Sequence, residues 1–320
     1  MIRSIIRFSA HNRALVLIAV AIATAYGVYT LRHIPIDAIP DLSDTQVIVY
    51  SRWDRSPDIM EDQVTYPIVA ALLGAPNVKV IRGFSDFGFS YVYVIFKDGT
   101  DIYWARSRVS EYLSKIQPQL PGGVKTELGP DATGVGWVFQ YALVDDSKTH
   151  SLVDLRSFQD WNLRYRLQSV PGVAEVASIG GFVQQYQVTV DPNRLKARGL
   201  SIAEVSEAVR KSNSDVGGRL LEFSGREYMV RGRGYIRSVA DIEKVVLKTD
   251  DLGTPVLVRD IGTVALGPEI RRGVSDLNGE GETVGGIVVV RYGQNVLQVI
   301  DRLKAKIAEV QPSLPAGVEI

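Results

Sequence analysis

The chain of 320 residues contains no cysteine, which excludes disulfide bonds, thiolate metal sites and cysteine nucleophiles. It also lacks an excess of either charge, because Lys plus Arg and Asp plus Glu number 36 each. The chain as a whole therefore has no electrostatic reason to favour nucleic acid, and no nucleic-acid partner is expected. Hydrophobic residues make up 46% and charged residues 22%, which is typical of a folded protein with two or three domains.

One long stretch near the N-terminus, residues 14–31, carries no charge. As a helix it would cover roughly 27 Å, close to the thickness of the hydrocarbon core of a bilayer. Three arginines precede it and the first acidic residue, Asp37, follows it, so the positive-inside rule places residues 1–13 in the cytoplasm. We therefore expect a transmembrane helix over residues 14–33 and an extracytoplasmic remainder. The arginines are Arg3, Arg7 and Arg13.

A cleaved signal peptide is the alternative for this segment, since small residues at 21–25 would suit a signal peptidase. The apolar run continues past these sites through Val28 and Leu31, which favours an uncleaved anchor.

The remainder contains an internal repeat. Residues 56–95 align without a gap with residues 151–190, and residues 117–124 resemble residues 311–318 at a shift of 194 instead of 95. The difference, 194 minus 95, is 99 residues, so the second copy contains an insertion as large as a domain. Aligned pairs include Ser56 and Ser151, Tyr66 and Trp161, Pro76 and Pro171, and Tyr91 and Tyr186.

Each copy has the pattern strand, helix, strand, strand, helix, strand, which predicts a ferredoxin-like βαββαβ unit. The second copy is expected to run from Trp137 to Val190 and to resume near Thr283, and its last strand stops at Ile320, as in a fragment of a longer protein. The insertion opens with a helix-capping Asp191 and has the composition of a small α+β domain. The expected fold class is α+β, with one N-terminal transmembrane helix before the two units.

Candidate functional residues are few. Arg82 opens an RGF triplet before a run of alternating aromatics, but the spacing does not fit an RNA-recognition motif, and the aromatics are read as one packed face. Glycines at 180–181 and 279–281 are predicted to form turns, and the acidic residues at 37–44 to form a polar linker. No catalytic triad or acid and base pair is indicated.

Residues that could bind a soft metal are scattered, so no metal site is predicted within the chain. Met229 falls in a strand pattern and is predicted to be a core residue. The histidines and the methionines beyond the first residue are His11, His33, His150, Met60 and Met229.

Several long blocks resemble the heavy-metal branch of the resistance-nodulation-division (RND) transporters, and the resemblance covers essentially the whole chain. It implies two porter subdomains, PN1 and PN2, and a docking subdomain inserted in PN2. The blocks are residues 35–47, 63–74, 82–101, 104–113, 127–145 and 277–282. The implied ranges are 1–13 for the cytoplasmic N-terminus, 14–33 for the transmembrane helix, 34–133 for PN1, 134–190 and 272–320 for PN2, and 191–271 for the docking subdomain.

The resemblance further implies a cation/proton antiporter rather than an enzyme, placed in the bacterial inner membrane with the residues after the first helix in the periplasm. Such pumps work as homotrimers, contact membrane lipid, and dock onto a periplasmic adaptor (membrane fusion) protein and an outer-membrane channel. They use no cofactor, and the transported metal ion is their substrate. The carboxylates that carry protons and the main metal cleft lie outside these 320 residues, while Arg82 would line the transport cleft.

The GVGW stretch at 134–137 resembles the copper and silver branch of that family, which implies Cu(I) or Ag(I) as the substrate. Ile270 departs from this branch, because it stands where a methionine would offer a thioether to a relay of soft ligands. Residues 52–57 also lack the glycine that is usual there. The alternatives are a divalent-cation pump (Zn, Co, Cd or Ni), a secreted periplasmic binding module, and an acylphosphatase-like enzyme on the same fold.

Overall fold

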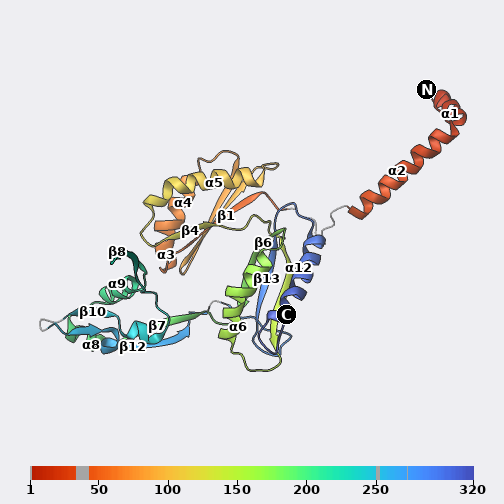
Figure 1. Ribbon diagram of the computed structural model, residues 1–320. Helices are drawn as coiled ribbons and strands as arrows, with labels where there is room; N and C mark the ends of the chain where they lie inside the picture. The colour runs from red at the N-terminus through yellow and green to blue at the C-terminus, as the bar shows by residue number, and fades with distance from the viewer. Residues whose placement is uncertain (1, 34–42, 250–252, 272) are drawn as a thin grey trace. The chain divides into compact units, whose positions relative to one another are not determined.

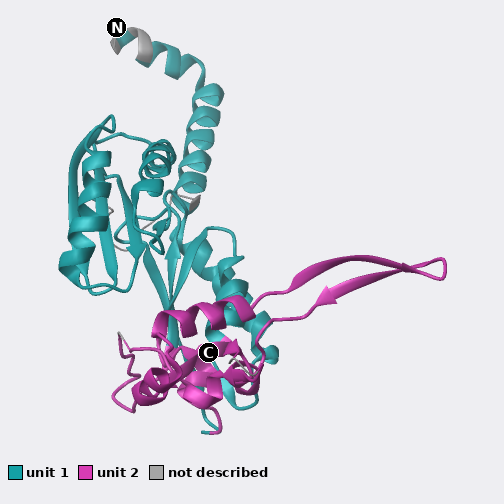
Figure 2. Ribbon diagram, turned by 90° about the vertical axis from the view of Figure 1, so that its left-hand side faces the viewer, with its two compact units in different colours: residues 1–148, 159–179, 285–320 teal, residues 149–158, 180–284 magenta. Residues whose placement is uncertain are grey.

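The computed structural model describes residues 2–33, 43–249, 253–271 and 273–320 (Figure 1). Contacts divide the chain into two units (Figure 2). One comprises residues 1–148, 159–179 and 285–320, and the other comprises residues 149–158 and 180–284.

Two helices open the chain, α1 (Ile2–His11) and α2 (Arg13–His33). The segment Arg13–Arg32 of α2 has a mean hydropathy of 2.1 and no buried residue, so it is long and apolar enough to cross a membrane. The helix expected over residues 14–33 is therefore α2. The aspartates at 37 and 41 of the expected polar linker lie outside the described residues, while Asp44 pairs with Lys79 at 3.1 Å.

The first module, residues 46–128, is a four-stranded sheet in the order β2-β3-β1-β4 with antiparallel neighbours. Figure 1 shows its helices gathered on one face of the sheet. Alternate residues of β1 and β3 point to that face and are buried with the apolar sides of the helices, as the period of two in a strand requires. Its elements are β1 (Gln46–Arg52), α3 (Pro57–Met60), η1 (Glu61–Thr65), α4 (Tyr66–Leu72), β2 (Val78–Asp86), β3 (Phe89–Phe96), α5 (Ile102–Ile116), η2 (Gln117–Gln119) and β4 (Lys125–Leu128).

The second module repeats this strand order. Its sheet runs β14-β5-β13-β6, so β5 takes the place of β1, β6 that of β2, β13 that of β3 and β14 that of β4. The two stretches therefore fold alike, as a duplicated unit requires. Its elements are β5 (Trp137–Asp145), α6 (Leu152–Phe158), η3 (Gln159–Leu163), α7 (Arg164–Gln168), β6 (Val173–Gly180), β13 (Val284–Val290), α12 (Val296–Val310), η4 (Gln311–Ser313) and β14 (Val318–Glu319).

The structure corrects the expected alignment at one strand. β7 (Gln184–Val190), expected as the third strand of the second copy, pairs along its whole length with β12 (Gly262–Pro268), and β13 fills the third position instead. The chain leaves the sheet at Gly180 and Gly181, which have φ of +69° and +63° and form the expected turn. The insertion therefore begins after Gly180 rather than after Val190, because an alternating strand fits either sheet and only its pairing partner decides between them.

The inserted segment, residues 181–283, holds two small cores. One is built around Leu195 and Ile261 and the other around Ile242 and Val258. Ser201 caps α9 in a capping box with Glu204, as its sequence spacing suggests. Its remaining elements are α8 (Pro192–Arg198), α9 (Ile202–Ser212), β8 (Val216–Phe223), β9 (Arg226–Gly232), α10 (Val239–Glu243), β10 (Val246–Thr249), β11 (Pro255–Leu257) and α11 (Val258–Ile261).

The β8–β9 hairpin projects from the rest of its unit (Figure 2), and every residue of both strands is exposed. Met229, predicted to be a core residue, lies in this hairpin with 81% of its surface exposed. The prediction was wrong because the alternation of a strand shows that side chains face two sides, but not that either side is covered.

Candidate functional site

The face of the first sheet opposite its helices carries aromatic rings and arginines. On β2 and β3, Arg82 lies opposite Tyr93 and Phe84 lies opposite Tyr91. The Tyr91 ring lies 6.4 Å from that of Phe84 and stacks on that of Phe89 at 6.1 Å. The alternating aromatics therefore share one face, but it is the face away from the helices, and Phe84 remains 57% exposed.

The loop that follows β1 shapes one end of this face. The Arg52 guanidinium lies 5.8 Å from the Phe89 ring centre, and that of Arg55 lies 4.8 Å from the ring of Trp53. The Trp53 amide donates to the Gly88 carbonyl at 3.1 Å, and the Gly88 amide donates to the Arg55 carbonyl at 2.9 Å. These bonds fix the loop on the β2–β3 turn, beside a groove of about 740 Å³. The stretch that lacks the usual glycine thus forms an ordered arginine and aromatic loop.

A tyrosine and a carboxylate lie on the same face. The Tyr50 hydroxyl donates to Glu127 Oε2 at 2.5 Å across the β1–β4 pair. Burial raises the pKa of Tyr50 to about 12, with a further contribution from the hydrogen bond and negative charge of Glu127.

This raised pKa predicts a change at high pH. The folded state favours the neutral form of Tyr50 more than the unfolded chain does. The contribution of Tyr50 to the free energy of unfolding is therefore fully present below pH 10.0 and is lost as the pH rises toward 12. The difference in ultraviolet absorbance between the protein and its Tyr50→Phe variant should show ionisation near pH 12. Glu127→Gln should lower that pKa without restoring 10.0, because burial persists, and an unchanged titration in Glu127→Gln would contradict the pairing.

Both modules bury polar side chains beside a π-helical turn in their first helix. In the first module, Thr65 ends η1, and its hydroxyl bonds the hydroxyls of Ser85 and Ser90 at 2.7 Å each. In the second, Gln159 opens η3 and donates to the Tyr141 hydroxyl at 2.8 Å, and burial raises the pKa of Tyr141. The two modules thus share a π-helical turn in addition to their strand order. The apolar spacing of the two helices does not predict this turn, because it depends on one extra residue in the helix.

Ile270 follows β12 and is 76% exposed. The next residue, Arg271, lies 4.8 Å from the Phe182 ring centre and pairs with Glu282 at 2.8 Å. Arg82 and Ile270 belong to different units, so the structure defines no site that joins them. Among the residues described, no group of three or more His, Cys, Asp or Glu could hold a metal ion.

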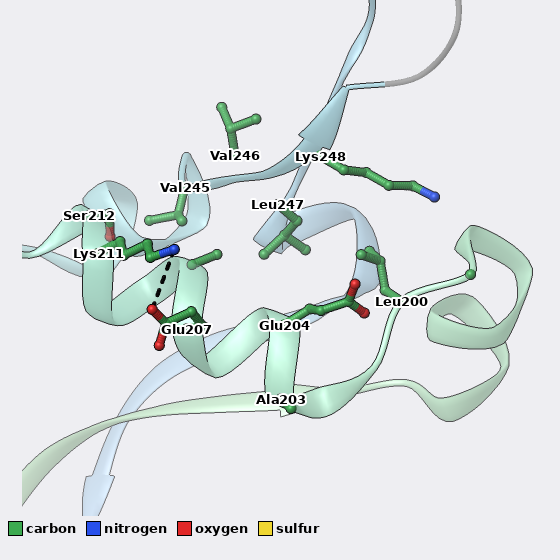
Figure 3. A pocket seen from close by; sticks show the side chains of 12 residues that line it. Leu200, Ala203, Glu204, Glu207, Lys211, Ser212, Val245, Val246, Leu247 and Lys248 are labelled. Atoms are coloured by element: carbon green, nitrogen blue, oxygen red, sulfur yellow. Dashed lines mark ion pairs between the residues drawn. The ribbon is translucent and has the colours of Figure 1, made fainter.

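The inserted segment carries a groove between α9 and β10 (Figure 3), with a volume of about 800 Å³. Leu200, Ala203 and Leu247 contribute apolar surface to it. Charged side chains also line it, among them the ion pair of Glu207 and Lys211 at 3.4 Å. It is a mixed apolar and charged surface without a convergent set of catalytic groups.

Comparison with known proteins gives consistent matches. The AcrB/AcrD/AcrF family matches residues 5–320. The chain is 53% identical over 321 residues to the cation efflux system protein CusA of Escherichia coli (strain K12) and 51% identical to the putative cation efflux system protein SilA of Salmonella typhimurium. It is 38% identical over 328 residues to the cobalt-zinc-cadmium resistance protein CzcA of Cupriavidus metallidurans. Each alignment covers 100% of this chain and 31% of the relative.

A solved structure gives the same result. The X-ray crystal structure of a heavy metal efflux pump, crystal form II, matches with a TM-score of 0.85 and 31% identity. The match covers 97% of this chain and 31% of the pump. The chain thus spans about a third of the length of the proteins that it resembles.

Proposed function

Because the chain belongs to the AcrB/AcrD/AcrF family, we propose that it forms the N-terminal part of a proton-driven heavy-metal efflux pump. The resemblance to the heavy-metal branch of the RND transporters is confirmed. The observation that carries the proposal is the match to a solved heavy-metal efflux pump, which covers nearly the whole chain, including α2 and both modules.

In this proposal the pump lies in the bacterial inner membrane. Helix α2 anchors the chain, residues 1–13 are cytoplasmic, and the residues after α2 lie in the periplasm. The first module is PN1 and the second is PN2, and the docking subdomain lies in the inserted segment, residues 181–283, which includes the β7–β12 pair. Arg82 contributes to the wall of the transport cleft, supported by its exposed place among the aromatic rings of the first sheet.

The proposed substrate is Cu(I) or Ag(I), on the pattern of residues 134–137. The test is metal tolerance of a sensitive bacterial host that expresses the complete protein. A gain in copper or silver tolerance alone is expected. A gain with zinc or cobalt instead would assign the pump to divalent cations, the alternative that the similarity to the cobalt-zinc-cadmium resistance protein keeps open.

Ile270→Met should increase copper or silver tolerance in the same host. The new thioether would be a soft ligand on an exposed chain, and because the side chain of Ile270 is 76% exposed, the exchange should not disturb a core. Ile270→Leu, which changes shape without adding sulfur, is the matched control. Equal tolerance in both variants would remove position 270 from the metal path.

We also propose that the complete protein is a homotrimer that binds a periplasmic adaptor and an outer-membrane channel. The β8–β9 hairpin supports a subunit contact, because two strands alone are marginally stable in water and this pair exposes several large apolar side chains. Cysteine cross-linking from the hairpin should give trimers in membranes, and only monomers would count against this assembly. The exposed apolar residues are Leu220, Leu221, Phe223, Tyr228 and Met229.

A further inference from the structure

Helix α1 has two distinct faces. Arg3, Arg7 and His11 follow one another at intervals of four residues, which places them along one side of a helix. Ile6 and Phe8 fall outside this stripe and are 63% and 57% exposed. With ten residues, α1 is about 15 Å long, half of what a span requires. Its polarity differs from that of α2, which is apolar on all sides between its terminal residues.

The break between the two helices is defined by local hydrogen bonds. Asn12 lies between them, and its side-chain amide donates to the Phe8 carbonyl at 3.2 Å. Arg13 Nε donates to the Ala10 carbonyl at 3.2 Å. Figure 1 draws α1 and α2 as two successive helices. The amphipathic segment thus ends where the apolar segment begins, so α1 adjoins the membrane face that α2 enters.

The basic residues of α1 and its position directly before α2 indicate which surface α1 contacts. A short amphipathic helix with basic residues on its polar side is typical of segments that lie in the interface of a bilayer. No acidic residue precedes Asp37, so the polar side of α1 would attract anionic lipid headgroups without internal competition. The cytoplasmic leaflet, where the arginines of the N-terminus belong, is the leaflet that presents this negative surface.

We propose that α1 lies in the plane of the cytoplasmic interface and binds anionic phospholipids. Ile6 and Phe8 enter the boundary of the acyl chains, and Arg3 and Arg7 contact the headgroups. The binding surface is distinct from the periplasmic modules and from the path of the metal. This proposal rests on the membrane placement proposed above, and it adds a lipid contact that fixes where α2 begins.

The test uses the complete protein in nanodiscs of phosphatidylcholine, with and without phosphatidylglycerol. The 320 residues contain no cysteine, so Phe8→Cys or Arg3→Cys introduces one label site in this part of the chain, with any cysteine elsewhere replaced. An environment-sensitive fluorophore at position 8 should report an apolar setting and be quenched by lipids that carry a shallow nitroxide. The same fluorophore at position 3, on the basic side of the helix, should remain in a polar setting.

Phosphatidylglycerol should increase the quenching at position 8, and Arg3→Gln with Arg7→Gln should abolish that increase. Each basic residue near an anionic surface contributes about a fivefold factor, so the double variant should lower the ratio of docked to free helix by about thirtyfold. Arg32→Gln, at the opposite end of α2, is the control and should leave the lipid dependence unchanged.

Three results would overturn the proposal. Equal exposure of positions 8 and 3 to water would show that α1 is not docked. A protected position 8 without lipid quenching would assign its apolar face to another helix of the pump. Third, mass analysis could find the N-terminus removed, or external reagents could reach it from the periplasmic side. Either result would contradict the proposed membrane placement itself, whereas the first two results would contradict only the lipid contact of α1.

Discussion

Replacing Phe96 with alanine is expected to lower the free energy of unfolding of the first module by about 3–5 kcal/mol, the usual cost of removing a fully buried phenylalanine. Phe96 ends β3 and has no exposed surface. Its ring meets Trp104 of α5 edge to face, with 6.4 Å between centres and 80° between planes. The substitution would leave a cavity between the sheet and α5, which close-packed neighbours refill only in part.

Amide hydrogen exchange would locate this loss. Protection should fall in β1, β3 and β4, which share one sheet, while the strands of the second sheet should keep theirs. Tyr66→Ala is the matched control, because this aromatic ring is 66% exposed and its removal should cost little. A fall of equal size in both sheets would mean that the two modules unfold together.

A lysine in place of Ile22 should remove the chain from the membrane. Ile22 lies near the middle of α2 and is 65% exposed along an apolar helix. At a helix centre the exchange of isoleucine for lysine changes the free energy of insertion by about 3–4 kcal/mol, or more than a hundredfold in equilibrium. The fraction of the 320-residue chain that resists alkaline carbonate extraction should fall accordingly.

Ile22→Leu provides the control, since it keeps the segment apolar and should leave the chain in the membrane. The same samples test the signal-peptide alternative. Recovery of a soluble chain that starts after residue 24 from the unsubstituted protein would contradict an anchor formed by α2.

Much of the architecture follows from periodicity. The apolar run gives α2, and the two offsets of the repeat predict a duplicated unit with one insertion. The error at β7 has a physical cause, because pairing between strands that lie 72 to 84 residues apart is set by hydrogen-bond partners that a local pattern does not specify. The offset of 194 in fact extends back through β13, where Val94 corresponds to Val288 and Phe96 to Val290.

The candidate site was less accessible to prediction. The sequence identifies Arg82 as a site residue only through the family resemblance, and the structure adds what surrounds it, a row of aromatic rings on the side of the sheet away from the helices. The sequence marks the Arg52 to Arg55 loop only by a missing glycine, since contacts between cations and aromatic rings depend on side-chain positions in space. The exposure of Met229 is not predictable for a related reason, because no sequence pattern distinguishes a hairpin covered by other side chains from one exposed to solvent.

The chain departs from the second sheet and returns to it at adjacent points of the backbone. Gly180 lies so close to Thr283 that a methyl group on Gly180 would overlap with the Thr283 carbonyl oxygen. About a hundred residues are thus inserted between two backbone positions that lie close together, and the close approach requires glycine at position 180. The inserted segment can therefore change in length or sequence without changing the strand order of the second sheet, because that order is set by strands on either side of the insertion.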